Sequence, residues 1–325
     1  MKYPVEFVLK LNEIYHDVEE REYENRHLDM FESEVVRWQK IGRLFIANNF
    51  KKICLLDIGS GTGFVPLQIA AFLKKGDLFT CSDISANILD VCKNRILNEK
   101  FNCEFDYMKL DGKRINLESN SFGYITMNSV LHHIPDFSTF FKEINRVLKT
   151  GGLLIIGHEP NKVFYTHKFL WNNYRFISFV IYPTKFIIAV LRRFNLLDFF
   201  KRIFHNFKWE VKTPKRIVEG VNKRLLEEGI IEAPLTDSEI TKIVDIHSPT
   251  AGGYHRDRGI DTSELLREYL PNFEIEYLET YNHLWRASPI NRFTKWYDSV
   301  LKKMFPDIGA TFMAVLRKLD RKRED

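Results

Sequence analysis

Between residues 53 and 158, short apolar runs alternate with longer amphipathic stretches, and this alternation constrains the fold more than any other feature of the sequence. Apolar runs of strand length lie at 53–57, 78–83, 103–111, 122–128 and 153–159. Stretches with a helical spacing of apolar residues lie between them, at 63–75, 86–100 and 136–149. Strands that alternate with helices form right-handed βαβ units around a sheet that helices cover on both faces. The sequence therefore predicts an α/β fold with a doubly wound, mostly parallel sheet.

The regions on either side of this core have a different pattern. Residues 1–50 carry apolar residues three to four positions apart, which is typical of amphipathic helices. Residues 160–260 interrupt the alternation with a long, mostly helical segment. Beyond it, the pattern predicts a helix at 262–270, a strand at 272–284, a helix at 291–304 and a last strand at 310–318.

The composition of the 325-residue chain indicates a globular protein with a substantial core, because 45% of its residues are hydrophobic and 28% are charged. This balance excludes a disordered, collagen-like or disulfide-scaffold protein. The four cysteines form no C-x-x-C pair, so they predict buried thiols in a reducing compartment rather than a zinc or redox motif. Since the N-terminal residues lack the apolar core of a signal peptide, we expect a cytoplasmic protein.

A glycine-rich segment, LLDIGSGTGF at residues 55–64, directly follows the first predicted strand and opens a helix. Gly59, Gly61 and Gly63 allow the backbone to adopt positive φ and to approach a ligand closely. Their spacing is one residue shorter than the dinucleotide-binding pattern G-x-G-x-x-G. The segment therefore predicts a ligand-binding loop of a related kind.

Acidic residues end the first three predicted strands, at Asp57, Asp83 and Asp111. In an open α/β sheet, ligands bind outside the carboxyl ends of the strands, so these acids share the edge where a ligand is expected. Carboxylates at this edge would repel a pyrophosphate, whereas they suit a cofactor that carries a sulfonium and an ammonium group.

Five stretches, in this order and spacing, resemble the class I S-adenosylmethionine-dependent methyltransferases: LLDIGSGTGF, CSDIS (81–85), KLDG (109–112), FGYITMNSVLHHIPD (122–136) and RVLKTGGLLIIGHEP (146–160). Residues 14–38 also look like the helical cap of this superfamily. The resemblance implies a seven-stranded, Rossmann-like methyltransferase fold with an antiparallel terminal strand and a large helical insertion between strands 5 and 6. It also implies S-adenosyl-L-methionine as the cofactor.

The resemblance assigns cofactor-binding roles to the residues that match the motifs. The methionine portion would be held by Asp57, Gly59, Ser60, Gly61 and Gly63. The adenosine portion would contact Asp83, Ile84, Asp111 and Gly112, of which Asp83 would accept hydrogen bonds from the ribose hydroxyls. Asn128 and Ser129 would line the sulfonium end. The alternative for Asp57 and Asp83 is a purely structural role as strand-end caps.

Methyl transfer from a sulfonium requires in-line positioning and, for a hydroxyl or amine acceptor, a base that removes a proton. The candidates follow the fourth and fifth strands, whose ends face the methyl group in this fold: His132, His133, His158 and Glu159. Histidine suits the role because its ordinary pKa lies near neutrality. The alternative is that each histidine is structural and satisfies nearby backbone groups.

The segment IHSPTAGGYHRDRG at 246–259 holds a second polar cluster, formed by His247, Tyr254, His255, Arg256 and Arg258. It is interpreted either as a loop that folds over the acceptor pocket or as a plain surface loop. The histidines are not spaced as in a zinc site, and we predict no metal. No Asn-Pro-Pro-Tyr-like motif follows the fourth strand, and no cysteine follows the fourth or fifth, which disfavours methylation of nucleic-acid bases.

Residues 160–224 carry 14 Lys and Arg against three acids, a local net charge of +11, and they are rich in aromatic residues. Three interpretations remain: a lid over an apolar acceptor pocket, a helix pair on a membrane surface, and an RNA-binding surface. We expect an apolar inner face over the methyl end and a basic outer face available to an anionic surface. The outer face would include Arg192, Arg193, Lys201 and Arg202.

These features together predict an S-adenosylmethionine-dependent methyltransferase that acts on an oxygen or nitrogen of a small-molecule acceptor, either apolar or lipid-linked. Peripheral contact with the inner, anionic membrane surface is compatible with this prediction. The alternatives are an RNA methyltransferase that uses the basic insertion and a cofactor-binding subunit without catalysis. The expected division is a helical cap (1–50), a cofactor-binding core (51–160), a helical insertion (161–260), and a C-terminal helix with the last two strands (261–325).

Overall fold

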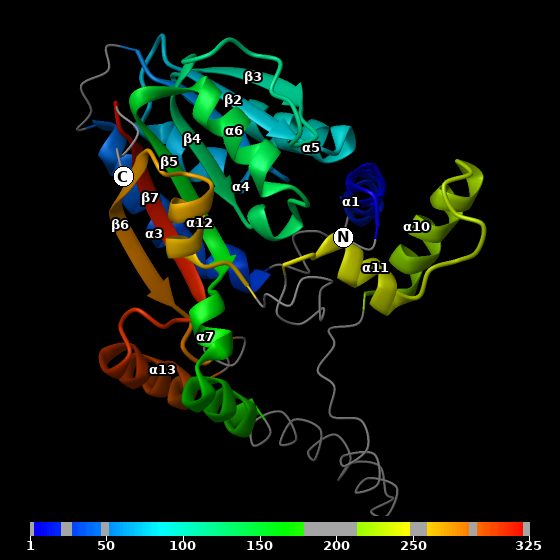
Figure 1. Ribbon diagram of the computed structural model, residues 1–325. Helices are drawn as coiled ribbons and strands as arrows, with labels where there is room; N and C mark the ends of the chain where they lie inside the picture. Colours follow the sequence, from blue (N-terminus) through cyan, green and yellow to red (C-terminus); the bar gives the residue numbers. More distant parts are fainter. Residues whose placement is uncertain are drawn as a thin grey trace, which may run out of the picture.

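The computed structural model describes residues 3–20, 28–46, 52–178, 213–247, 259–285 and 291–320. Figure 1 shows one twisted sheet with helices against its faces and further helices beside one end. The strands are β1 (Cys54–Ile58), β2 (Leu78–Asp83), β3 (Glu104–Lys109), β4 (Phe122–Asn128), β5 (Leu148–Pro160), β6 (Phe273–Tyr281) and β7 (Thr311–Lys318). The α-helices are α1 (Val5–Glu19), α3 (Leu28–Ile46), α4 (Phe64–Ile69), α5 (Ala86–Leu97), α6 (Phe137–Val147), α7 (Lys162–Thr166), α10 (Lys215–Glu227), α11 (Asp237–Val244), α12 (Thr262–Glu268) and α13 (Arg292–Met304). Two short 3₁₀ turns are η2 (Ala70–Phe72) and η3 (Leu131–His133).

The seven strands form one sheet in the order β3-β2-β1-β4-β5-β7-β6. The first five strands along the chain pair in parallel, whereas β7 runs antiparallel between β5 and β6. This topology confirms the predicted seven-stranded α/β fold, its antiparallel terminal strand and the insertion between β5 and β6. The strand order reverses between β1 and β4, which is the point where ligands bind in open α/β sheets.

The central strands of the sheet are buried on both faces because helices cover each of them. On one face, the apolar side chains of Leu56 and Leu154 pack with those of α6 and α12. On the other face, the neighbouring residues Leu55 and Ile155 pack with α3, α4 and α5. Successive strand residues point to opposite faces, so runs such as ICLL must be apolar throughout to serve both layers.

Strand β5 begins at Leu148, earlier than the predicted start at residue 153. Leu148 already pairs with Phe122 of β4, and the register then shifts before Tyr124 pairs with Leu153. Gly151, with a φ of +75°, lies within this irregular part. Gly151 and Gly152 interrupt the apolar run from which the strand was predicted. The predicted strand therefore begins later than the backbone pairing does.

Helices α1, α10 and α11 form a separate packing unit beside the carboxyl end of the sheet (Figure 1). Their shared core contains Leu11 of α1, Val221 of α10 and Ile240 of α11, all fully buried. The Arg224 guanidinium of α10 also donates to Asp17 of α1 at 2.8 Å. The chain's first helix therefore packs against the described part of the insertion, whereas α3 covers the sheet. The division into four domains stays a prediction.

Trp38 joins α3 to the end of β4. Its indole is fully buried, and its Nε1–H donates to Asn128 Oδ1 at 2.9 Å. Nearby, the buried carboxylate of Glu34 accepts from the Tyr281 hydroxyl at 2.8 Å. These two bonds place polar partners at specific points of an otherwise apolar contact, which sets how α3 lies against the strand ends.

We expect Trp38→Phe to destabilise the protein by about 1–3 kcal/mol, because the Asn128 carbonyl oxygen loses the indole N–H and the contact loses volume. Denaturant unfolding of the two proteins measures this difference. Val36→Ala is the matched control on the same helix, since the Val36 side chain is 74% exposed. An unchanged free energy of unfolding in Trp38→Phe would contradict the proposed importance of this contact.

Candidate active site

The loop between β1 and α4 needs glycine at the positions where the sequence has it. Gly59 has a φ of +67°, and a Cβ there would lie 2.4 Å from Cγ2 of Val130. Gly61, with a φ of +53°, donates its backbone N–H to Asp83 Oδ2 at 2.9 Å. A side chain at position 59 would clash with Val130, and the positive φ at both positions favours glycine, so the loop follows this path with glycines.

The Asp83 carboxylate at the end of β2 holds this loop in place. Besides Gly61, it accepts from the Ser85 backbone N–H at 3.0 Å. Burial raises the pKa of Asp83, and it outweighs the backbone hydrogen bonds and the charge of His16, which act to lower that pKa. The same carboxylate lies in the wall of a pocket, where a ligand's hydroxyl groups could donate to it.

This pocket lies at the carboxyl edge of the sheet, where ligands bind in open α/β folds. Its wall combines the loop after β1, the ends of β2 and β3, the loop after β4, and helix α1. The lining residues are Leu9, Asn12, His16, Ile58, Gly59, Gly61, Asp83, Ile84, Ile88, Leu110, Asp111, Gly112, Ser129, Val130, His133 and Ile134. Seven of the residues proposed from sequence to bind cofactor are thus brought together: Gly59, Gly61, Asp83, Ile84, Asp111, Gly112 and Ser129.

The other four proposed cofactor residues lie behind the wall. Ser60 Oγ accepts from the Ser82 backbone N–H at 3.1 Å, and Gly63 precedes the first residue of α4. Asn128 holds Trp38, as described above. Asp57 is fully buried and accepts from Thr126 Oγ1 at 2.6 Å, while its Oδ2 has no hydrogen-bond partner among the described residues.

The environment of Asp57 fits a cationic ligand. Burial raises the pKa of Asp57 to about 7, against the opposing hydrogen bonds of Thr126 and Ser60, and the nearby charge of Asp83 raises it further. A buried carboxylate with one oxygen unpartnered is costly unless a positive group approaches it. The ammonium group that the sequence resemblance implies would supply such a charge next to the glycine loop.

Comparison with known proteins agrees with this geometry. Residues 56–156 match the family model described as a methyltransferase domain. The segment is a methyltransferase domain. A demethylmenaquinone methyltransferase from Staphylococcus aureus (strain MRSA252) is 32% identical over 103 residues, which are 31% of this chain and 40% of that protein. The chain thus spans less than half the length of the curated relatives it matches.

Solved structures with lower sequence identity were also found. An S-adenosylmethionine-dependent methyltransferase from Mesorhizobium loti is 13% identical, with 86% of this chain and 96% of that chain covered and a TM-score of 0.46. For a methyltransferase from Methanosarcina mazei the identity is 18%, the coverage 85% and 97%, and the TM-score 0.42.

Glu159, near the end of β5, anchors the loop that follows β4. Its carboxylate is fully buried and accepts from the backbone N–H groups of Val130 at 2.6 Å and Leu131 at 2.7 Å. The second oxygen lies 2.8 Å from Nδ1 of His132. Burial acts to lower the pKa of His132, but the charge and hydrogen bond of Glu159, helped by the charge of Asp245, outweigh it and raise that pKa.

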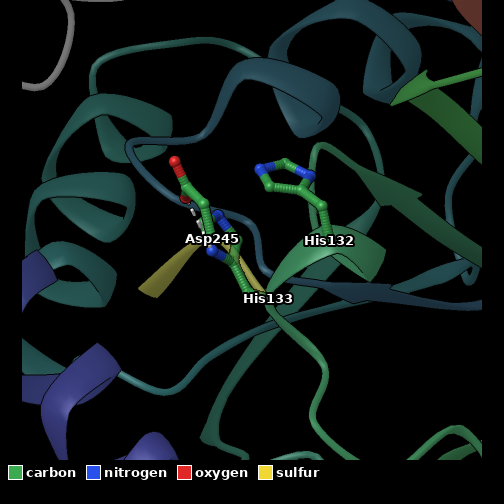
Figure 2. Close-up of side chains that lie close together, drawn as sticks. All are labelled: His132, His133 and Asp245. Carbon is green, nitrogen blue, oxygen red and sulfur yellow. Dashed lines mark ion pairs between the residues drawn. The ribbon is translucent and has the colours of Figure 1, made fainter. Parts of the chain in front are cut away.

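His133 is the sequence-proposed base that lies in the pocket wall. Its Nδ1 lies 2.9 Å from the Val244 carbonyl oxygen and 3.4 Å from Asp245 Oδ1. Because a carbonyl only accepts, Nδ1 carries the proton and Nε2 keeps its lone pair in the neutral ring. Figure 2 shows how His132 and His133 from η3 and Asp245 at the end of α11 gather at one place.

His158 lies outside the pocket wall. Its backbone has a φ of +53°, and its Nδ1 lies 3.1 Å from Glu34 Oε1. Burial acts to raise the pKa of Glu34, but the hydrogen bond and charge of His158, with Arg37 and Tyr281, lower it overall. His158 therefore belongs to the contact that joins α3 to the sheet.

Sequence reasoning missed three residues that the fold brings to the site. Asn12 and His16 of α1 line the pocket, and Asp245 approaches His133 from α11. The spacing of Leu9, Asn12 and His16 is that of one helical face, which is a signal that polar residues there share a surface. Nothing local to Asp245 indicates its partner, because the two residues are more than a hundred positions apart.

The side chains of His132, His133 and Asp245 each offer a ligand atom, and these atoms lie within 4.8 Å of one another. Such donors are of the kind that zinc accepts, whereas the sequence predicts no metal, and this stays a prediction. Of the second polar cluster, His247 is described: its Nε2 lies 3.1 Å from the Ile134 carbonyl oxygen. Tyr254, His255, Arg256 and Arg258 lie outside the described residues, as do Arg192, Arg193, Lys201 and Arg202.

Asp83→Asn should weaken binding of S-adenosylhomocysteine about 10- to 100-fold, because the charged acceptor is lost and an amide would face the Gly61 N–H. Isothermal titration calorimetry measures the change. Asp77→Asn is the control: Asp77 is also buried, but it accepts from the Ile53 and Lys74 backbone N–H groups, away from the pocket. Equal affinities of the wild type and Asp83→Asn would contradict the assigned role.

The contribution of Asp57 to the stability of the ligand-free protein should fall as the pH rises from about 4 to about 7. In this window the folded state keeps a proton on Asp57, whose pKa is about 7, while the unfolded chain has released it. Asp57→Asn removes this proton linkage, so its stability relative to the wild type should be greater at pH 8 than at pH 5. Denaturant unfolding at both pH values measures this, and a pH-independent difference would argue against the raised pKa.

Proposed function

We propose that this chain transfers a methyl group from S-adenosylmethionine to an oxygen or nitrogen of a small-molecule acceptor, apolar or lipid-linked, with His133 as the general base. The observation that carries this proposal is the position of His133. It lies in the wall of the pocket that holds the glycine loop and Asp83, with its Nδ1 fixed by the Val244 carbonyl.

The cofactor would be held by residues that this chain places around the pocket. The loop at Gly59 and Gly61 would leave room for the methionine portion. The Asp57 carboxylate, which lies behind this loop, would supply negative charge. Asp83 would accept from the ribose hydroxyls, and Asp111, which follows β3 and lines the same pocket, would contact the adenosine portion. When bound, S-adenosylmethionine supplies an electrophilic methyl group on a positively charged sulfur.

The chain's own part in the chemistry is to position the acceptor and to take its proton. His133 Nε2 accepts the proton of an acceptor O–H or N–H as the acceptor atom attacks the methyl carbon. The resulting imidazolium is stabilised by Asp245, whose Oδ1 lies 3.4 Å from Nδ1. Glu159 acts as a positioning residue, because it holds the backbone of the loop that carries His133.

The rings of His132 and His16 lie next to His133 and form one cluster with it. The centroids of the His132 and His133 rings lie 4.0 Å apart, and the His16 ring lies 5.3 Å from that of His133. Burial acts to lower the pKa of His16, yet Glu19, Asp83 and Asp245 raise it overall. The carboxylates around these rings favour a proton on the cluster after it leaves the acceptor.

A small molecule is preferred over RNA as the acceptor because the described part of the basic insertion uses several of its cations internally. Lys162 pairs with Glu264 at 2.7 Å and Arg224 with Asp17 at 2.8 Å. Lys215 and Lys223 pair with acids one helical turn away. The matched relative is named for demethylmenaquinone, but the match spans the cofactor-binding part, so it supports the donor rather than the acceptor.

Incubation of the protein with S-adenosylmethionine carrying a labelled methyl group and a cell extract tests this function. We expect label in a small-molecule or lipid fraction. Label in the RNA fraction would favour the RNA methyltransferase, and no transfer by a protein that binds S-adenosylhomocysteine would favour the non-catalytic subunit. If His132, His133 and Asp245 act without a metal ion, addition of EDTA should leave the rate of methyl transfer unchanged.

With that acceptor, His133→Asn should lower kcat about 10²- to 10⁴-fold, because asparagine retains a donor for the Val244 carbonyl but cannot take a proton. Affinity for S-adenosylhomocysteine should stay within about threefold of the wild-type value. His167→Asn, at a histidine outside the pocket wall, is the control for kcat. Unchanged kcat in His133→Asn would exclude His133 as the base.

A second substitution, Glu159→Gln, should lower the pKa of His132 in an NMR titration, since the carboxylate that raises this pKa is gone.

A further inference from the structure

The helix that follows α7 packs beside α13, the helix in the connection between β6 and β7. Residues 168–178 are helical and follow α7, and α13 lies next to them (Figure 1). The Tyr297 hydroxyl donates to Asn173 Oδ1 at 3.1 Å, and the ring centroids of Phe169 and Phe305 lie 5.7 Å apart. Since Phe169 precedes Asn173 while Phe305 follows Tyr297, the two helices run antiparallel.

A strip of large apolar side chains borders this helix contact and faces solvent. Its members and exposed fractions are Phe169 (52%), Phe176 (64%), Phe293 (55%), Trp296 (59%) and Met304 (61%). Phe169 and Phe176 share a helical face with Asn173, and Phe293 and Met304 share one with Tyr297. Because Asn173 and Tyr297 touch, the two sets lie on adjoining flanks. We call these five residues the aromatic strip.

The helix pair does not need the aromatic strip for its own packing. It has a separate buried core in which Leu170, Tyr174 and Leu301 pack with Phe164. Single exposed apolar residues are ordinary, but five large ones on the adjoining flanks of two packed helices indicate an interaction surface. The strip is therefore explained by something that covers it rather than by folding.

Positive charges surround the aromatic strip. Five exposed cations on the two helices have no ion pair with another described residue: Lys168, Arg175, Arg292, Lys295 and Lys303. A sixth, Lys302, pairs with Glu279 at 2.9 Å. Residues 162–178 contain no acid, and α13 contains only Asp298. The Asp298 carboxylate accepts from the Leu284 backbone N–H at 2.8 Å. The rim of the strip thus has a strongly positive field.

We propose that the aromatic strip and its basic rim dock the protein on an anionic lipid bilayer. Tryptophan and phenylalanine insert at the boundary between headgroups and acyl chains, while lysine and arginine extend to anionic headgroups. A protein partner fits less well, because interfaces between proteins are depleted in lysine. Within the described ranges, no helix is long and apolar enough to cross a membrane, so contact would be at the surface.

The placement of the strip relates it to the pocket. Helix α7 directly follows β5, and β5 is parallel to β4 and β1, so all three strands end at the edge that carries the cofactor pocket. A bilayer docked on the strip would lie near that edge of the sheet. The proposal concerns docking alone and does not depend on which acceptor is methylated.

Flotation of the whole protein with vesicles tests the proposal. We expect the wild type to float with vesicles that contain phosphatidylglycerol, less so as salt is raised, and not with pure phosphatidylcholine. The double substitution Phe293→Ser/Trp296→Ser should reduce partitioning at least tenfold. Replacement of Arg292, Lys295 and Lys303 by Gln should reduce it roughly a hundredfold. Val36→Ser/Leu97→Ser is the matched control, because these exposed apolar residues lie away from the strip.

Binding of S-adenosylhomocysteine verifies that each variant is folded and separates this test from that of methyl transfer. Wild-type protein that ignores anionic vesicles at low salt would overturn the proposal. Variants of the strip that float as well as the wild type would also overturn it, because another part of the chain would then bind the lipid. Sedimentation that shows a dimer lost in Phe293→Ser/Trp296→Ser, without vesicle binding by the wild type, would assign the strip to a second copy instead.

Discussion

The buried carboxylate of Glu159 connects the end of β5 to the loop that follows β4, and the arrangement of the site depends on this contact. It accepts hydrogen bonds from three backbone N–H groups, those of Val130, Leu131 and His132, and it contacts the imidazole Nδ1 of His132. A buried carboxylate is tolerated only where donors converge on it, so the loop must curl around its oxygens. Val130 then packs beside Gly59, and His133 enters the pocket wall. The loop, the glycine turn and the base are therefore coupled through one side chain.

Negative charge is the second organising feature of the site. Asp83 and Asp245 lie around the pocket and the histidines, and Asp57 lies behind the glycine loop. Burial makes each ionised carboxylate expensive by itself, as the raised pKa of Asp57 shows. A ligand with a positive sulfur and an ammonium group compensates for that cost, which accounts for a pocket that would repel a pyrophosphate. Binding affinity and the protonation of the pocket should thus be linked.

The fold and half of the residues that line the pocket could be predicted from the sequence, whereas the contacts of the histidines could not. The glycine loop at 59–63 and the strand-end acids are local patterns, and the topology then brings Asp83 and Asp111 to one edge. His158 and Glu159 are adjacent in β5, but their side chains contact opposite neighbours, Glu34 of α3 and the loop after β4. The sequence alone does not tell which of these two residues faces α3 and which faces the loop after β4.

The sequence by itself determined what local backbone geometry and periodicity control: the alternation of strands and helices, the glycines that allow positive φ, and the acids at the strand ends. Only the tertiary structure decided which side chains meet, because Glu34 and His158 or Val244 and His133 are separated by more than a hundred residues. Such contacts depend on how α1, α3 and α11 pack against the sheet. That packing follows from the shapes of buried apolar faces summed over many residues, and no short sequence pattern contains this information.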